Sequence, residues 1–253
     1  MNHCNGQLNW PLADQKIMDA YWIKRQQAQE GSVKEMGRVL PILFNTDMVR
    51  AVLDGRKTVT RRAVRYKYNN TEMKMRTDKY GTRLIEIQKA IEGETHGKNP
   101  DGSTWHKLLP YIEKNPPYRK GDILYVRETF RPLSDHPAAG IEYAADWSSK
   151  YFENSKEPDC CNRGKWIPSI HMPKQAARIW LKVTDVRAER LQDIDTLGCQ
   201  REGIDITRNG VIKRFSTLWD STLKKKDLAL YGWEVNPWVW VIGFERCEKP
   251  EEG

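Results

Sequence analysis

The sequence LDGRKTVTRR, residues 53–62, joins a predicted helix to a predicted strand. Asn45 or Thr46 can cap the preceding helix, in which apolar residues recur at helical spacing. Gly55 tolerates the left-handed conformation that ends many helices, so we expect the helix to stop there. The two threonines and the valine that follow favour a strand. The junction therefore brings a lysine, two threonines and three arginines into one short stretch.

The order of these residues, Gly55-x-Lys57-x-x-Thr60-x-Arg62, resembles the signature of the ASCH family. The fold of that family is similar to the PUA barrel found in RNA-modifying proteins. Many family members have glutamate at the place of Thr60. Threonine there resembles a branch of small amidohydrolases that remove the acetyl group from N4-acetylcytidine. The alternative interpretation is a solvated basic turn, because charged residues are mostly exposed.

The resemblance also implies a catalytic glutamate, because the context of Glu202 is similar to the segment that carries this residue in the amidohydrolase branch. We expect a short helix there, capped by Asp193 or Asp195 and ended by Gly203. A glutamate in the last turn of a helix is disfavoured by the helix dipole, which favours a functional role. The alternative is a solvent-facing glutamate.

Composition limits the class of protein. The chain has 253 residues, with 42 Lys+Arg against 34 Asp+Glu and a net charge of +8, which favours an anionic partner such as RNA. No run of about 18 apolar residues is present, and the first residues lack the apolar core of a signal peptide. Five scattered cysteines are typical of reduced thiols. We therefore predict a cytoplasmic protein without a membrane span.

The resemblance implies an α+β fold, a PUA-like (ASCH) β-barrel with flanking short helices and insertions. We expect residues 1–36 to form an N-terminal helical extension and residues 37–247 to form the domain, with a basic insertion at about 64–118. The apolar patterns predict strands and helices, and we place a turn at residues 189–190. The predicted strands are 39–44, 123–126, 141–145, 179–184 and 238–244, and the predicted helices are 45–53, 193–203 and 211–223.

The insertion interleaves basic and aromatic residues. Arg65 and Lys67 alternate with Tyr66 and Tyr68, and Lys74 and Arg76 follow before Tyr80. Cations meet phosphates and rings stack on unpaired bases, so we predict a nucleic-acid surface here. The alternative is a solvated insertion between strands, since charged runs are common on exposed faces.

Three other features offer possible chemistry. Glu128 ends a predicted strand whose pattern resembles a second conserved strand of ASCH proteins, and it either faces the site or pairs with Arg61 or Arg62. Cys160 and Cys161 are adjacent and lack the spacing of structural zinc sites, so we predict no metal and no cofactor. His171 lies between two prolines, in a segment that resembles one in phage-type ASCH proteins. These surroundings favour a packed or hydrogen-bonded loop histidine over a catalytic base.

Hydrolysis of an amide needs a nucleophile, a base and a group that protonates the departing amine. Thr60 supplies a hydroxyl, and Lys57 can accept its proton if a desolvated, cationic environment lowers the lysine pKa. Glu202 could shuttle a proton or orient the lysine. We predict that Gly55, Arg56, Arg62 and Glu128 bind substrate, with Arg62 or a backbone N–H stabilising the oxyanion.

One geometric difficulty follows from the spacing. Residues three apart in a regular strand point to opposite faces, so Lys57 must lie in the turn, or the strand must bulge, for it to meet Thr60. Two other functions stay open: a non-catalytic RNA-binding module, and a ribonuclease in which Lys57 and Arg62 hold a scissile phosphate beside a carboxylate. The oligomeric state is also open.

Overall fold

A computed structural model describes residues 37–68, 71–78, 81–88, 96–98, 104–106, 111–132, 140–147 and 165–251. The predicted N-terminal extension, residues 1–36, lies outside the described residues, as do Cys160 and Cys161. Within the described part of the chain, no helix is long and apolar enough to cross a membrane.

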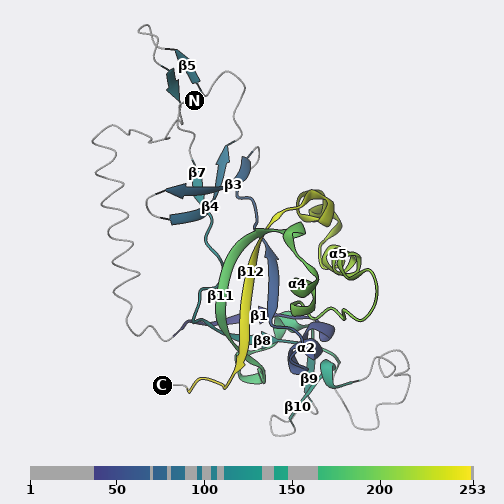
Figure 1. The fold of residues 1–253 in the computed structure, drawn as a ribbon. Helices are drawn as coiled ribbons and strands as arrows, with labels where there is room; N and C mark the ends of the chain where they lie inside the picture. The colour runs from purple at the N-terminus through teal and green to yellow at the C-terminus, as the bar shows by residue number, and fades with distance from the viewer. Residues whose placement is uncertain are drawn as a thin grey trace.

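A five-stranded mixed sheet forms the centre of the fold (Figure 1). Only the first pair of strands is parallel, and every other pair in the sheet is antiparallel. The long, curved strands β11 and β12 run beside each other through its middle. The order across the sheet is β1 (Val39–Leu43), β8 (Ile123–Arg127), β11 (Trp180–Arg190), β12 (Trp238–Cys247) and β2 (Val59–Ala63).

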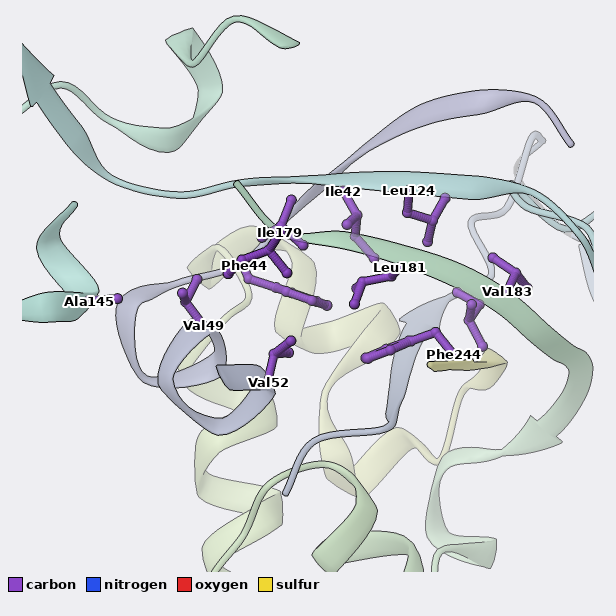
Figure 2. Close-up of a cluster of buried hydrophobic side chains, with 12 residues drawn as sticks. Ile42, Phe44, Val49, Val52, Leu124, Ala145, Ile179, Leu181, Val183 and Phe244 are labelled. Atoms are coloured by element: carbon purple, nitrogen blue, oxygen red, sulfur yellow. The ribbon is translucent and has the colours of Figure 1, made fainter. Parts of the chain in front are cut away.

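Helix α2 (Thr46–Leu53) connects β1 to β2 and packs on one face of the sheet. The side chain of Asn45 caps it by accepting a hydrogen bond from the Met48 N–H at 2.9 Å, as predicted. Apolar side chains from α2 and four strands fill the space between them (Figure 2). The buried members of this first core are Ile42, Phe44, Val49, Val52, Leu124, Val126, Ala145, Ile179, Leu181, Val183, Ile242 and Phe244.

A second core lies on the opposite face of β12. Successive residues of a strand point to opposite faces, so Val239 and Val241 face away from Ile242 and Phe244 of the first core. Helices α4 (Thr196–Arg201) and α5 (Val211–Ser221) cover this face. The buried members of the second core are Val59, Leu191, Ile194, Cys199, Phe215, Trp219, Val239 and Val241.

The insertion folds into strands of its own. β3 (Thr71–Asp78), β4 (Gly81–Gln88) and β7 (Tyr111–Glu113) form a three-stranded antiparallel sheet. This sheet lies beyond one end of β11 and β12, and the Trp238 indole donates a hydrogen bond to the Met73 carbonyl at 3.1 Å (Figure 1). The remaining elements are β5 (His96–Lys98), β6 (Thr104–His106), β9 (Phe130–Pro132), β10 (Ile141–Tyr143), α6 (Leu228–Tyr231) and short 3₁₀ helices.

The predicted α+β class is confirmed, but the central sheet is open in the described residues, where the resemblance implies a closed barrel. Its edges are β1 and β2. Pro41 gives β1 a residue without an N–H, which hinders a further strand. Side chains bind the β1 carbonyl oxygens instead. The Tyr118 hydroxyl donates to the Pro41 carbonyl at 2.8 Å, and the Arg62 guanidinium donates to the Leu43 carbonyl at 2.8 Å. One arginine thus bridges the two edge strands.

Candidate functional site

The site is built where the ends of two helices meet. Lys57 follows α2, and Glu202 caps the C-terminus of α4 after Asp195 has capped its N-terminus. The two residues pair as an isolated antiparallel bridge. The Thr58 N–H donates to the Arg201 carbonyl at 2.8 Å next to that bridge. Residues 145 positions apart are therefore held together by main chain as well as side chain.

Lys57 and Glu202 form a buried ion pair. The Lys57 Nζ lies 2.6 Å from Glu202 Oε2 and also donates to the Glu202 carbonyl oxygen at 3.1 Å. The lysine side chain is 0% exposed and the glutamate side chain 6%. A buried charge of this kind requires a hydrogen-bonded counter-charge, which the carboxylate supplies.

Gly203 permits this close approach. Its φ of +94° lies in the region that L-residues with a Cβ avoid. A Cβ added to Gly203 would lie 2.8 Å from the Ala51 Cβ and 3.3 Å from the Lys57 Cβ. Glycine at this position therefore ends α4 and leaves room for α2 to lie against it.

Burial lowers the pKa of Lys57. The ion pair and hydrogen bond with Glu202 act in the other direction, while the positive charges of Arg62 and Arg61 lower the pKa further. The net direction is downward, so this ammonium loses its proton more readily than that of an exposed lysine. The site therefore has the electrostatic property that a lysine base requires.

Arg61 and Arg62 point to opposite faces of β2, as neighbours in a strand do. Arg61 lies on the side of α4, where its guanidinium donates to Glu202 Oε1 at 3.2 Å and to Glu189 Oε2 at 3.4 Å. Arg62 binds the β1 edge and lies 5.8 Å from the Phe44 ring centroid. Burial lowers the pKa of Arg62. The sequence did not indicate that Arg61 contacts Glu202.

Thr60 is buried on the same face of β2 as Arg62, opposite Ile242 of β12. Its hydroxyl makes no hydrogen bond with a described residue. Lys57 precedes β2 in the turn, and its Nζ lies 5.6 Å from the centroid of the Phe44 ring, which Arg62 also approaches. The lysine therefore lies between the two faces, contacting Glu202 on one and the Phe44 ring on the other.

Gly55 and Arg56 lie at the exposed start of this turn. Gly55 has a φ of +72°, as the predicted helix end requires. Arg56 forms an ion pair with Asp54 at 2.8 Å and donates to the Gly203 carbonyl at 2.9 Å. Arg56 thus links the two segments that carry Lys57 and Glu202, and its predicted substrate contact stays a prediction.

Glu128 pairs with an arginine, but not with either predicted one. The Arg178 guanidinium donates to its two oxygens at 2.9 and 3.1 Å, and also binds both oxygens of Asp146. Burial raises the pKa of Glu128, and the hydrogen bond and charge of Arg178 oppose that rise. The predicted partner, Arg61 or Arg62, is wrong, because Arg178, 50 positions away and two residues before β11, binds both carboxylate oxygens.

The predicted nucleic-acid residues lie in or beside the insertion sheet. Arg65 is an anchor: it pairs with Asp227 at 3.1 Å, and its guanidinium lies 4.7 Å from the Tyr231 ring centroid. Lys74 pairs with the Glu72 carboxylate at 2.5 Å. The Lys67 ammonium lies 5.4 Å from the Tyr68 ring centroid, and Arg76 is half-buried on β3.

No group of three or more possible metal ligands occurs among the described residues. His171 ends an exposed 3₁₀ helix. The chain was compared with protein-family models, with curated proteins and with solved structures, and none of the three comparisons gives a match. The fold and the site together define an α+β protein with a buried lysine–glutamate pair beside a threonine-bearing strand.

Proposed function

We propose that this protein hydrolyses an acylated nucleobase such as N4-acetylcytidine, with Thr60 as nucleophile and Lys57 as base. The observation that supports the proposal is the buried 2.6 Å contact between Lys57 and Glu202, at the start of the strand that carries Thr60. We further propose that the fold is an ASCH-type, PUA-like barrel that is open between β1 and β2.

The proposed reaction begins when Lys57, in its neutral form, accepts the proton of the Thr60 hydroxyl. The threonine oxygen attacks the acetyl carbonyl carbon, and Arg62 stabilises the negative charge on the carbonyl oxygen. The bond from that carbon to the base nitrogen breaks, and the Lys57 ammonium returns the proton to the departing amine. Water then hydrolyses the acetyl–threonine ester, giving acetate and free enzyme.

Glu202 has a positioning role in this mechanism. It accepts two contacts from the Lys57 side chain, one at its carboxylate and one at its carbonyl oxygen, so the amine has one preferred direction. A base must be fixed within hydrogen-bond reach of the proton that it accepts. The proposal therefore requires substrate binding to bring Thr60 within that reach.

The assay uses the full chain and measures cytidine and acetate released from N4-acetylcytidine. The Lys57→Arg variant keeps the positive charge but replaces a titratable amine with a guanidinium that stays protonated. We expect turnover to fall by about two to four orders of magnitude, the usual effect of losing acid–base catalysis. Equal turnover by both proteins would exclude Lys57 as the base. No turnover by the wild type would exclude this substrate.

A second candidate function is RNA binding without reaction, because no hydrogen bond joins Lys57 to Thr60 in the described part of the chain. In that case Lys57→Arg should be silent, while Lys57→Glu abolishes affinity for a short RNA. The ribonuclease alternative is less favoured, since Arg178 already binds both oxygens of Glu128. That leaves Glu202 as the carboxylate candidate near Lys57.

A further inference from the structure

Glu202 is shared between two cations. Its Oε2 accepts from Lys57 at 2.6 Å, and its Oε1 accepts from Arg61 at 3.2 Å. Arg61 is itself shared, because its other terminal nitrogen lies 3.4 Å from Glu189 on β11. The ions thus alternate in sign from Lys57 to Glu202, Arg61 and Glu189.

The alternation continues to the surface. Glu189 also accepts from the Arg187 Nε, and Arg187 pairs with Asp185 at 2.7 Å. The exposed fraction of the side chains rises along this path, from 4% at Arg61 to 24% at Glu189 and 55% at Asp185. The inner end of the network is therefore dry, whereas its outer end is screened by water.

Arg61 is held in a way that hydrogen bonding alone does not explain. Its Nε is buried and has no hydrogen-bond partner among the described residues. A buried donor without a partner costs free energy, so such a group needs a reason. Helix α4 also leaves space beside it: a Cβ added to Gly198 would lie 2.9 Å from Ile194 Cγ1, 3.0 Å from Asp195 Oδ1 and 3.3 Å from the Arg61 Nη2. The charge of Arg61, placed between two carboxylates, supplies that reason.

We propose that Arg61 is a positioning residue that sets how firmly Glu202 holds the ammonium of Lys57. Arg61 draws one oxygen of Glu202 away and leaves the other for the lysine. Glu189 moderates this effect by taking part of the charge of Arg61. The inference deepens the proposed function and takes its catalytic meaning from it.

The other charged groups around Lys57 have separate places. Arg62 faces Lys57 from the opposite side of β2 and binds the β1 edge, so its effect is direct repulsion. Tyr118 interacts with Arg62, and desolvation raises the pKa of its hydroxyl, so it stays neutral. Burial raises the pKa of the Cys199 thiol, beside Arg61 and Glu202, to about 11, and it stays neutral at pH 7.

The pKa of Lys57 is measured by NMR titration of protein labelled with ¹³C at the lysine ε-carbon, without substrate. The Lys57 resonance is identified by its absence from Lys57→Arg. In Arg61→Met, Glu202 holds Lys57 alone, so the pKa of Lys57 should rise. In Glu189→Gln, Arg61 competes more strongly for Glu202, so the pKa of Lys57 should fall. Lys182→Gln, which removes one exposed cation from the same strand as Glu189, should leave the pKa of Lys57 unchanged.

A second arm tests whether the effect passes through Glu202. The rise caused by Arg61→Met should shrink when Glu202 is already glutamine, because the shared carboxylate is gone. An equal rise in both backgrounds would mean direct repulsion only and would overturn the proposal. If the Glu202→Gln proteins do not fold, Glu189→Gln decides alone, since an unchanged or raised pKa there also overturns it.

The catalytic part is tested in the same proteins. The acid limb of the pH profile for N4-acetylcytidine hydrolysis should move with the NMR pKa, upward in Arg61→Met and downward in Glu189→Gln. A wild type that hydrolyses nothing refutes the proposed function and leaves the NMR result to decide the role of Arg61. If the enzyme is active but the acid limb of its pH profile does not shift with the pKa of Lys57 measured by NMR, the catalytic role of this network is refuted.

Discussion

Lys57 is a cation with no access to water, and its charge depends on one carboxylate. Removing one partner of a buried ion pair leaves an uncompensated charge, which costs about 3–5 kcal/mol. Glu202→Gln should therefore lower the free energy of unfolding by about that much at pH 7. The pKa of Lys57 lies below its ordinary value, so the ammonium loses its charge as pH rises. The decrease in unfolding free energy caused by Glu202→Gln should thus be smaller at pH 9 than at pH 7. Urea unfolding of both proteins at the two pH values tests this.

An equal loss at pH 7 and pH 9 would contradict this account, because it would show that the charge of Lys57 is not the cause. Glu72→Gln is the matched control, since it removes a half-exposed carboxylate that pairs with the exposed Lys74. Exposed pairs contribute about 0–1 kcal/mol, so its effect should be small at both pH values.

Gly203 and Gly55 allow a paired test of conformation against space. Both have positive φ, but a Cβ on Gly55 meets nothing within 4 Å, whereas one on Gly203 lies 2.8 Å from the Ala51 Cβ. Gly55→Ala should cost about 1–2 kcal/mol from backbone strain alone. Gly203→Ala should cost about 1–3 kcal/mol more from the clash, measured by thermal unfolding. Equal losses would mean that the α2–α4 contact relaxes freely.

At the scale of elements, the insertion sheet depends on one buried carboxylate. Glu86 accepts from the Lys67 and Tyr68 N–H groups and the Thr71 hydroxyl at 2.7–3.0 Å, and it forms an ion pair with Lys114. Desolvation would raise the pKa of Glu86, but the Lys114 contact and these hydrogen bonds outweigh it and lower the pKa from 4.5 to about 2. The carboxylate thus joins β4 to the segment that leaves the central sheet.

This lowered pKa predicts acid sensitivity of the insertion. A carboxylate whose pKa is lower in the folded state stabilises fully above 4.5 and loses that effect as pH falls toward 2, here about 3 kcal/mol. Amide hydrogen exchange in β3 and β4 should accelerate over this range before exchange in β11 and β12 does. Glu86→Gln should abolish that pH step, while Glu72→Gln keeps it. A step that survives in Glu86→Gln would assign it to another group.

The sequence predicted the elements that depend on neighbouring residues. The Asn45 cap, the helix end at Gly55 and the Asp195 and Gly203 boundaries of α4 are confirmed, because each rests on contacts within one turn of helix. The predicted turn at residues 189–190 is wrong, since β11 continues to Arg190. Leu181 and Val183 stand at odd numbers, whereas Val186 and Ala188, after the register shift, stand at even numbers, so the alternation changes phase within the strand.

Side-chain partners distant in the chain were harder to predict. The contact of Lys57 with Glu202 followed from a resemblance, whereas Arg178 as the partner of Glu128 had no local signal. Arg61 shows why: which carboxylate a buried arginine meets depends on strand order and helix placement, and periodicity does not fix either. The open sheet was also not predictable from local pattern. Its two edge strands are joined by a hydrogen bond from Arg62 to the Leu43 carbonyl, and no sequence pattern relates these two residues.

At the scale of the whole molecule, the net charge of +8 raises the question of where RNA would bind. Substituting Arg65 would not test RNA binding alone, because its ion pair with Asp227 anchors the insertion. Lys67→Gln combined with Lys74→Gln removes two exposed cations instead. If each contacts one phosphate of a single strand, the slope of log K against log salt should flatten by about 1.4, two contacts at about 0.7 each.

The control for this prediction is Lys182→Gln, an exposed cation on the central sheet, which should leave the salt slope unchanged. Hydrolysis of free N4-acetylcytidine should survive the double substitution, because a nucleoside has no phosphate backbone to bind. An unchanged slope in the double variant would mean that the insertion is not the RNA surface.

The separation of 145 residues between Lys57 and Glu202 has a consequence for biosynthesis. At a translation rate of about 5–20 residues per second, Lys57 is made roughly 7–30 seconds before its counter-ion. During that interval β2 also lacks β12, its hydrogen-bonded neighbour, which is translated later still. A ribosome-bound chain stalled before Glu202 should therefore leave Lys57 open to amine-reactive reagents, and synthesis of residues 202–253 should protect it.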